Sequence, residues 1–169
     1  MESFNKYVIE KACREDLAEI LALQKAAFMD VARLIQKFEL PALLQTEAEI
    51  DGEYETCVIL KYVVEDGRIV GSVRAFADGE DICRIGKLIV AADCRNRGVG
   101  RALMAAIESY FPSCRKFALF TSEETPNTFH LYTKIGYHTV GKKEMGGTVM
   151  LLMEKDNPPP EEQGGSAQL

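Results

Sequence analysis

The stretch that decides the fold is residues 88–103, which read Leu-Ile-Val-Ala-Ala-Asp-Cys-Arg-Asn-Arg-Gly-Val-Gly-Arg-Ala-Leu. Its first three residues close an apolar run that predicts a strand over residues 82–90. From Val99 onward, apolar residues recur at the spacing of one helix face, so a helix begins at Gly98-Val99-Gly100. The stretch therefore predicts a strand, a short turn and a helix in direct succession.

The composition of this turn suits an anion. The first backbone N–H groups of a helix have no partner within the helix, and the helix dipole makes that end partly positive. Glycines let a phosphate approach the backbone, and arginines add charge-assisted hydrogen bonds. The arginines that surround the glycines are Arg95, Arg97 and Arg101. The residues alone leave open a second interpretation, in which the glycines serve only the turn and the arginines are solvated.

The turn matches neither of two common phosphate motifs. Its glycine spacing is not G-x-G-x-x-G, which argues against a Rossmann dinucleotide site, and it is not G-x-x-x-x-G-K-[ST], which argues against a P-loop.

The remaining segments predict a mixed α/β order, β-α-α-β-β-β-α-β-α-β-β. Strands are expected near residues 6–11, 57–65, 69–76, 82–90, 116–121, 137–143 and 148–155. Helices are expected over residues 16–28, 31–38, near 47, over 99–110 and over 126–134, with 40–46 as a loop broken by proline. Asp66-Gly67 predicts a tight hairpin turn between the second and third strands.

The length of 169 residues predicts a single domain, over residues 1–155, followed by a mobile tail rich in proline, glycine and glutamate over 156–169. Five cysteines without a C-x-x-C pair, and only two histidines, argue against a disulfide framework and against a metal site. A formal net charge of −6 argues against nucleic acid and anionic membranes as partners. Without a recognisable signal peptide or a long apolar run, a cytoplasmic protein is expected, and a homodimer stays open.

Two motifs give the chain a family resemblance. Residues 88–103 resemble the acetyl-CoA motif of the GNAT (GCN5-related) N-acetyltransferases, a strand followed by [RQ]-x-x-G-x-[GA] and a helix. Residues 129–137, Phe-His-Leu-Tyr-Thr-Lys-Ile-Gly-Tyr, resemble the second signature of that family, Y-x-K-x-G-[FY]. The order of elements is similar over residues 6–155. The resemblance implies a mostly antiparallel, twisted sheet with a central V-shaped splay between strands 82–90 and 116–121, flanked by helices.

The resemblance also implies a site for acetyl-CoA as co-substrate. Pantetheine is expected to pair with the backbone of Leu88, Ile89 and Val90. The diphosphate is expected on the segment formed by Arg95, Asn96, Arg97, Gly98, Val99, Gly100 and Arg101. The family asparagine falls at Thr125, and Asn127 is expected to reach the cofactor instead. Tyr132 aligns with the tyrosine that lies near the CoA sulfur, which implies a general acid for the departing thiolate.

The sequence does not identify a general base. Some family members carry a glutamate where this chain has, approximately, Arg84 or Phe120. The acids at strand ends are simpler to explain as solvated charges: Glu53, Glu80, Asp81, Glu123 and Glu124.

The acceptor site is expected in residues 28–53, whose notable polar residues are Arg33, Gln45, Thr46 and Glu47. The acidic charge and the absence of a peptide-docking insertion favour direct acetyl transfer to a small-molecule amine. Two alternatives stay open: a protein or peptide N-acetyltransferase, and a CoA-binding module without catalysis.

Overall fold

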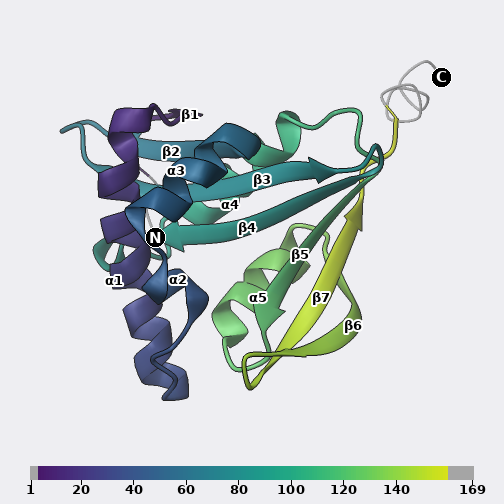
Figure 1. Ribbon diagram of the computed structural model, residues 1–169. Coiled ribbons are helices and arrows are strands. Elements are labelled where there is room, and N and C mark those ends of the chain that lie inside the picture. The colour runs from purple at the N-terminus through teal and green to yellow at the C-terminus, as the bar shows by residue number, and fades with distance from the viewer. Residues whose placement is uncertain (1–3, 160–169) are drawn as a thin grey trace. The chain divides into compact units, whose positions relative to one another are not determined.

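The computed structural model describes residues 4–159, apart from the side chain of Pro126. Its seven strands are β1 (Tyr7–Lys11), β2 (Val58–Val64), β3 (Ile69–Asp78), β4 (Ile82–Val90), β5 (Lys116–Ser122), β6 (His138–Met145) and β7 (Thr148–Asp156). Its α-helices are α1 (Leu17–Ile35), α2 (Pro41–Leu44), α3 (Glu47–Thr56), α4 (Val99–Ser109) and α5 (Pro126–Lys134). Figure 1 shows these elements along the chain.

The strands form one mixed sheet in the order β1-β2-β3-β4-β5-β7-β6. The pairs β1–β2, β5–β7 and β6–β7 are antiparallel, whereas β4 and β5 are parallel, with Ile82–Arg84 opposite Lys116–Ala118. The mostly antiparallel α/β sheet with flanking helices confirms the predicted fold class. The central splay stays a prediction.

Contacts among the described residues gather in two compact units. The first comprises residues 4–74 and 86–107, and the second residues 75–85 and 108–159. Strands β3 and β4 contribute to both units, so each unit is discontinuous in sequence. The single domain expected over residues 1–155 stays a prediction.

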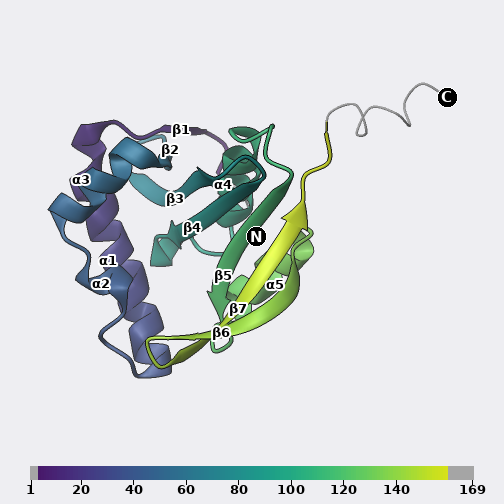
Figure 2. The ribbon, with the colours of Figure 1, turned by 45° about the vertical axis from the view of Figure 1, so that its right-hand side comes forward.

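The first unit packs helices on both faces of its strands. Figures 1 and 2 show α1 and α3 on one side of β2 and β3, and α4 on the other. The core on the α1 side is formed by Ala12, Leu17, Ile20, Leu21, Ile50, Ile59, Ile69 and Ile89. On the α4 side, a Cβ added at Gly71 would lie 2.8 Å from Val99 Cγ1 and 2.9 Å from Leu103 Cδ1. Helix α4 therefore packs directly on the backbone of β3.

Helix α1 corrects one prediction. Residues 16–28 and 31–38 were expected to form two helices, but α1 is continuous from Leu17 to Ile35. The segment between them contains neither proline nor glycine, so nothing breaks the backbone hydrogen bonds there. The helix ends at Gln36, whose φ of 57° is left-handed and whose N–H donates to the carbonyl of Ala32.

The segment after α1 corrects a second prediction. Residues 40–46 were expected to be a loop, but Pro41–Leu44 forms the helical turn α2. Proline suits the first position of a helix, where its missing N–H is not needed. Helix α3 then begins at Glu47, near where a helix was expected. Thr46 Oγ1 accepts from the Glu49 N–H at 3.2 Å, and a Glu49 carboxylate oxygen accepts from the Thr46 N–H at 3.0 Å.

The second unit contains β5, β6, β7 and α5. Strands β6 and β7 form a hairpin that turns at Gly146 and Gly147, whose φ angles are 59° and 79°. Helix α5 is joined to β5 by a 2.9 Å hydrogen bond between the hydroxyls of Thr128 and Thr121. Beneath these strands, Glu108 accepts from the Tyr137 hydroxyl at 2.8 Å and from Lys155 Nζ at 2.9 Å.

The end of β7 lies one residue beyond the strand expected from the sequence. Asp156 pairs with Lys116, and the Asn157 side chain donates to the carbonyls of Phe111 and Cys114. Residues 160–169 of the predicted mobile tail lie outside the described residues, so the tail stays a prediction.

Candidate functional site

The predicted phosphate turn lies within the first unit, between β4 and α4. After Val90, the Ala91 N–H donates to the carbonyl of Val70 at 2.8 Å, and a single 3-10 turn follows over Ala92–Cys94. Asn96 and Gly98 then adopt left-handed φ angles of 61° and 81°. A Cβ at Gly98 would meet no atom within 4 Å, so glycine is required there by its backbone conformation rather than by crowding. The two left-handed residues turn the chain into α4.

The N-terminus of α4 is held firmly. Val99, Leu103, Met104 and Ile107 are buried, which fixes the helix against the core of the first unit. The Ala102 N–H donates to the carbonyl of Gly98 at 3.0 Å, as in the first turn of a helix. The N–H groups that precede Ala102 have no acceptor within the helix, which makes them available to an anion. The structure thus brings the predicted residues 95–101 together in one turn.

Two arginines of this turn contact other protein groups. Arg95 Nη2 donates to Asp30 Oδ2 of α1 at 3.0 Å. The Arg97 guanidinium carbon lies 4.7 Å from the ring centre of Phe4, a cation–π contact. Arg101 follows in the first turn of α4 and is exposed. Asp30 was not predicted, because it precedes Arg95 by 65 residues and no local pattern joins them.

An ion pair between Arg68 and Asp93 stabilises the start of the turn. Arg68 Nη1 donates to Asp93 Oδ2 at 3.1 Å, and this hydrogen bond lowers the pKa of the Asp93 carboxyl below its usual value. Burial raises the pKa of the neighbouring Cys94 thiol, whose residue is 1% exposed. Cys94 is therefore a neutral, buried thiol that packs beneath the turn.

The positions of β4 expected to bind pantetheine carry apolar side chains that are buried or half-buried. Ile89 is buried in the core, and Leu88 and Val90 are half-buried. Directly before them, Lys87 has a φ of 52° within β4, which is unusual for a residue other than glycine. Such conformations are often found at functional sites.

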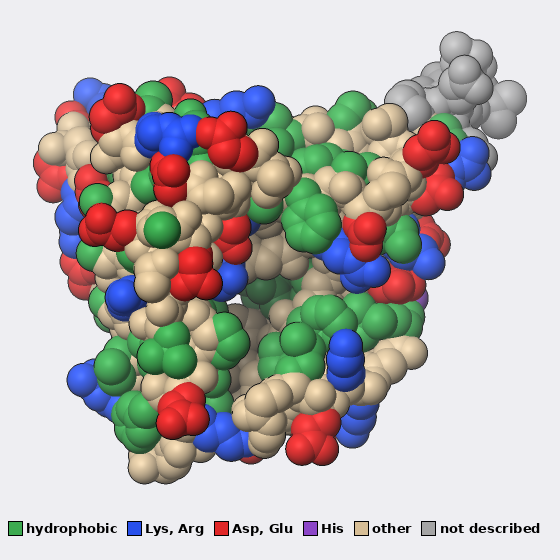
Figure 3. Space-filling model, in the orientation of Figure 1, with side chains coloured by type: hydrophobic (Ala, Val, Ile, Leu, Met, Phe, Trp, Pro, Cys, Tyr) green, Lys and Arg blue, Asp and Glu red, His purple; other side chains and the backbone are tan. Residues whose placement is uncertain are grey.

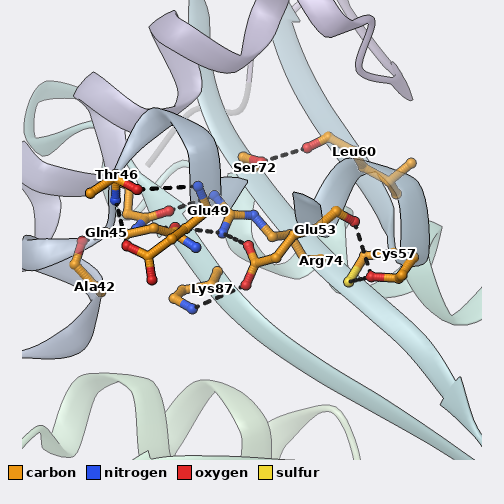
Figure 4. A network of polar contacts seen from close by, with 12 residues as sticks. Ala42, Gln45, Thr46, Glu49, Glu53, Cys57, Leu60, Ser72, Arg74 and Lys87 are labelled. Atoms are coloured by element: carbon orange, nitrogen blue, oxygen red, sulfur yellow. Dashed lines mark hydrogen bonds and ion pairs between the residues drawn. The ribbon is translucent and has the colours of Figure 1, made fainter. Parts of the chain in front are cut away.

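A buried polar network lies beside Lys87 (Figure 4). Arg74 on β3 is 4% exposed, and its guanidinium donates to Gln24 Oε1, to Gln45 Oε1 at 3.1 Å and to Glu53 Oε2 at 2.6 Å. Glu53 Oε1 lies 3.9 Å from Lys87 Nζ. Burial lowers the pKa of Arg74 despite the neighbouring Glu53 carboxylate. The network therefore ties α1, α3 and the segment before α3 to the sheet.

The network divides the residues expected near the acceptor. Gln45 is part of it, whereas Thr46 caps α3, Arg33 contacts Asp30 at 3.5 Å and Glu47 is exposed. Glu53 is also part of the network, so its explanation as a solvated charge was wrong. Sequence reasoning missed the other members: Gln24, Arg74 and Lys87. The sequence held one signal for Arg74: it is a charged residue inside the apolar run of β3, and a buried charge needs partners.

The predicted general acid lies in the second unit. Tyr132 on α5 is 7% exposed, and its ring packs edge-on against Tyr137 with 6.0 Å between the ring centres. Burial raises the pKa of the Tyr132 hydroxyl above its ordinary value, so this group is protonated at neutral pH. Asn127 lies in the first turn of α5 and is exposed.

Arg84 and Phe120, at the positions where some family members carry a glutamate base, lie in the second unit. Arg84 Nε donates to Asp78 Oδ2 at 2.6 Å, and Phe120 is a partly exposed ring. Neither side chain can accept a proton as a base. Among the other acids considered, Asp81 pairs with Arg115 and Glu123 pairs with Lys142.

All five cysteines are free thiols. Within residues 4–159, no cluster of three or more histidine, cysteine, aspartate or glutamate side chains is arranged to hold a metal ion. None of the helices described is both long and apolar enough to cross a membrane.

Comparisons with known proteins concern the family and the fold of the chain. The family model described as "Acetyltransferase (GNAT) family" matches residues 17–137. A curated Bacillus subtilis protein, UPF0157 protein YqkA, is 25% identical over 119 residues, which are 70% of this chain and 34% of that protein. The chain therefore spans about a third of the length of this relative.

Solved structures show the same fold. PaiA N-acetyltransferase from Thermoplasma acidophilum, in complex with coenzyme A, has a TM-score of 0.76 at 14% identity, over 89% of this chain and 99% of that chain. Phosphinothricin acetyltransferase from Sinorhizobium meliloti, in complex with AcCoA, has a TM-score of 0.71 at 15% identity, over 89% and 88%. A chimera of spermidine N-acetyltransferase SpeG from Vibrio cholerae and hSSAT has a TM-score of 0.71 at 16% identity, over 90% and 96%.

The family model covers well over half of the chain, and it includes both the phosphate turn and the tyrosine helix. The chain therefore belongs to the acetyltransferase (GNAT) family.

Proposed function

We propose that the protein transfers an acetyl group from acetyl-CoA directly to a primary amine of a small molecule. The observation that carries the proposal is the turn at residues 95–101, where left-handed Asn96 and Gly98 lead into a firmly packed α4. Family membership supports acetyl transfer, and coenzyme A or AcCoA is bound in two of the similar structures.

The cofactor would bind mainly through backbone groups. The amides from Arg95 to Arg101 would hold the diphosphate, and the backbone of Leu88, Ile89 and Val90 would pair with pantetheine. Arg97 and Arg101 would add positive charge, and Asn127 is the further side chain we assign to the cofactor. Arg95 would contribute its side chain only after it leaves Asp30.

The reaction would proceed in one transfer. The neutral amine attacks the thioester carbonyl, and the backbone N–H of Ile89 or Val90 stabilises the oxyanion that forms. When the C–S bond breaks, the thiolate receives a proton from the Tyr132 hydroxyl, which burial keeps protonated by raising its pKa. The products are the acetylated amine and free CoA.

The proton of the acceptor needs a separate route. An alkyl ammonium with a pKa of about 10.4 is deprotonated in roughly one molecule in 2,500 at pH 7. We assign no side chain as the base, so the proton would pass to water.

A small acceptor is supported by charge. The chain carries a formal net charge of −6, and Figure 3 shows acidic and basic side chains interspersed over the helices of the first unit. The negative net charge favours an approaching ammonium, although salt screens the field over about 8 Å. Two of the similar structures are acetyltransferases named for small amines, spermidine and phosphinothricin. The proposal includes a cytoplasmic location, which five free cysteines support.

The test follows CoA release with a panel of small amines, amino acids and peptides between pH 7 and pH 9. With small amines we expect the rate to rise by about tenfold per pH unit, as neutral amine becomes available. In the same assay, Tyr132→Phe should lower turnover by about 100-fold while acetyl-CoA affinity is retained. Efficient acetylation of peptides alone would overturn the small-molecule substrate. CoA binding without release from any acceptor would indicate a non-catalytic module.

A further inference from the structure

Glu53 differs from every other acid of α3 in how its carboxylate is held. Its Oε2 accepts a 2.6 Å hydrogen bond from Arg74, a residue that is itself 4% exposed. Arg74 is fixed in turn by Gln24 and Gln45, which are 0% and 8% exposed. A carboxylate bonded to so rigid a donor is preorganised, because little side-chain entropy remains to be lost when a ligand binds.

The second oxygen of Glu53 is available. The side chain is 32% exposed, and Oε1 has Lys87 Nζ at 3.9 Å, which is beyond hydrogen-bonding distance. Lys87 is 29% exposed, so its ammonium can turn into solvent. The pair is therefore a loose contact between a fixed carboxylate and a replaceable primary ammonium (Figure 4).

The position of this contact relates it to the cofactor. Lys87 directly precedes Leu88, Ile89 and Val90, whose backbone we assign to pantetheine. It has a left-handed φ of 52° within β4, and its ammonium lies beside Glu53 of α3. A ligand at Glu53 Oε1 would thus lie next to the strand that presents the reacting end of the cofactor.

From this arrangement we infer that Glu53 is the carboxylate that binds the acceptor as an ammonium, in the place where Lys87 Nζ now lies. Arg74 is the positioning residue that orients this carboxylate. The inference rests on the proposed function for its reaction, and it concerns the binding step only. The amine loses its proton after binding, so Glu53 determines acceptor affinity and specificity rather than the chemical step.

The experiment measures amine binding directly, without relying on turnover. The full chain is saturated with CoA, and ligand-observed NMR gives the dissociation constants of n-butylamine, an ammonium at pH 7, and of aniline, which is mostly neutral there. Glu53→Gln keeps an oxygen that can accept from Arg74 and should preserve the fold, which circular dichroism verifies. We expect this variant to weaken butylammonium binding by about tenfold, which corresponds to the loss of one charge-assisted hydrogen bond. The dissociation constant of aniline should stay within about twofold of the wild-type value.

Two further variants keep the inference falsifiable. Lys87→Gln removes the competing ammonium and should tighten the binding of butylammonium by about threefold. Glu55→Gln makes the same charge change two residues away on α3, in an exposed pair with Arg14, and should change the affinity by less than about twofold.

The outcomes separate this inference from the proposed function. Equal losses in Glu53→Gln and Glu55→Gln would show a general field effect and overturn the assignment. Lower thermal stability of Glu53→Gln with unchanged butylammonium affinity would make Glu53 a partner of Arg74 only, and would also overturn it. Failure of butylammonium to bind the wild-type CoA complex would also overturn the assignment. Failure of the wild type to bind CoA would instead count against the proposed function.

Discussion

The first unit contains two regions built in opposite ways, the phosphate turn and the polar network of α1, α3 and β3. The turn depends on backbone: left-handed Asn96 and Gly98 and the first amides of α4. The network depends on side chains that meet across the sequence, since Gln24 and Arg74 are 50 residues apart. A backbone site is encoded locally and is recognisable as a motif, whereas a side-chain network is visible only after folding. Substitutions should therefore affect the two regions differently.

The largest effect is expected from Arg74→Ala, which removes the centre of the network. It leaves the Gln24 carboxamide buried and the Glu53 carboxylate without its cation, and it should lower the free energy of unfolding by about 3–5 kcal/mol. Urea unfolding would measure this change, with Arg84→Ala as the control. Arg84 forms an exposed pair with Asp78 and should contribute less than about 1 kcal/mol. Equal losses in the two variants would remove the distinction between the buried network and an ordinary surface pair.

A smaller effect is expected from Gly100→Asp in the phosphate turn. It concerns the free energy of acetyl-CoA binding. A carboxylate there would repel the diphosphate and displace it from the amides, and losing two charge-assisted bonds corresponds to about 100-fold in acetyl-CoA affinity. Calorimetry would measure the affinity, and the unfolding free energy should change little. Gly141→Asp adds the same charge on β6, where a Cβ meets no atom within 4 Å, and should leave the affinity unchanged. Undiminished affinity in Gly100→Asp would place the cofactor elsewhere.

The smallest effect is expected from Thr46→Ala, which tests a local signal inside the side-chain region. Thr46 caps α3 by accepting from the Glu49 N–H, and removing a cap costs about 1 kcal/mol. Thr56→Ala at the other end of α3 should cost less, because that hydroxyl makes two weak contacts, a 3.5 Å bond to the Glu53 carbonyl and a 3.8 Å contact with Cys57 Sγ. Thermal unfolding of both variants would measure the difference. A Thr46→Ala loss as large as that of Arg74→Ala would mean that α3 is held by its cap rather than by the network.

The accuracy of the sequence predictions follows the same division. The bounds of β4 and α5 agree with the predicted residues 82–90 and 126–134, because apolar runs and proline mark their ends locally. The start of α4 at Val99 follows from its helical apolar spacing. The continuity of α1 through Val31 was missed, although its buried residues follow one helix face from Leu17 to Ala32. Two of those buried positions are Gln24 and Ala32, which give an apolar pattern little signal.

Within the candidate site, the turn at residues 95–101 lies where the sequence predicted it, and its binding of a diphosphate stays a prediction. The side-chain partners of its arginines were not predicted. Asp30, which holds Arg95, and Gln24, which holds Arg74, lie on a helix that is distant in sequence from both arginines. The left-handed conformation of Lys87 was equally hidden, because lysine has no preference for positive φ. Such features arise from tertiary packing, which overrides local preference.

If acetyl-CoA binds at the proposed turn, the close approach at Gly71 gives β3 an influence on cofactor binding. Because even one methyl group would meet Val99 Cγ1 and Leu103 Cδ1, a substitution at Gly71 requires these two side chains at the start of α4 to shift. In a mutational scan scored by acetyl-CoA affinity, position 71 would therefore group with the residues of the turn. A remote position of this kind offers protein engineers a way to adjust the affinity without altering any group assigned to the cofactor.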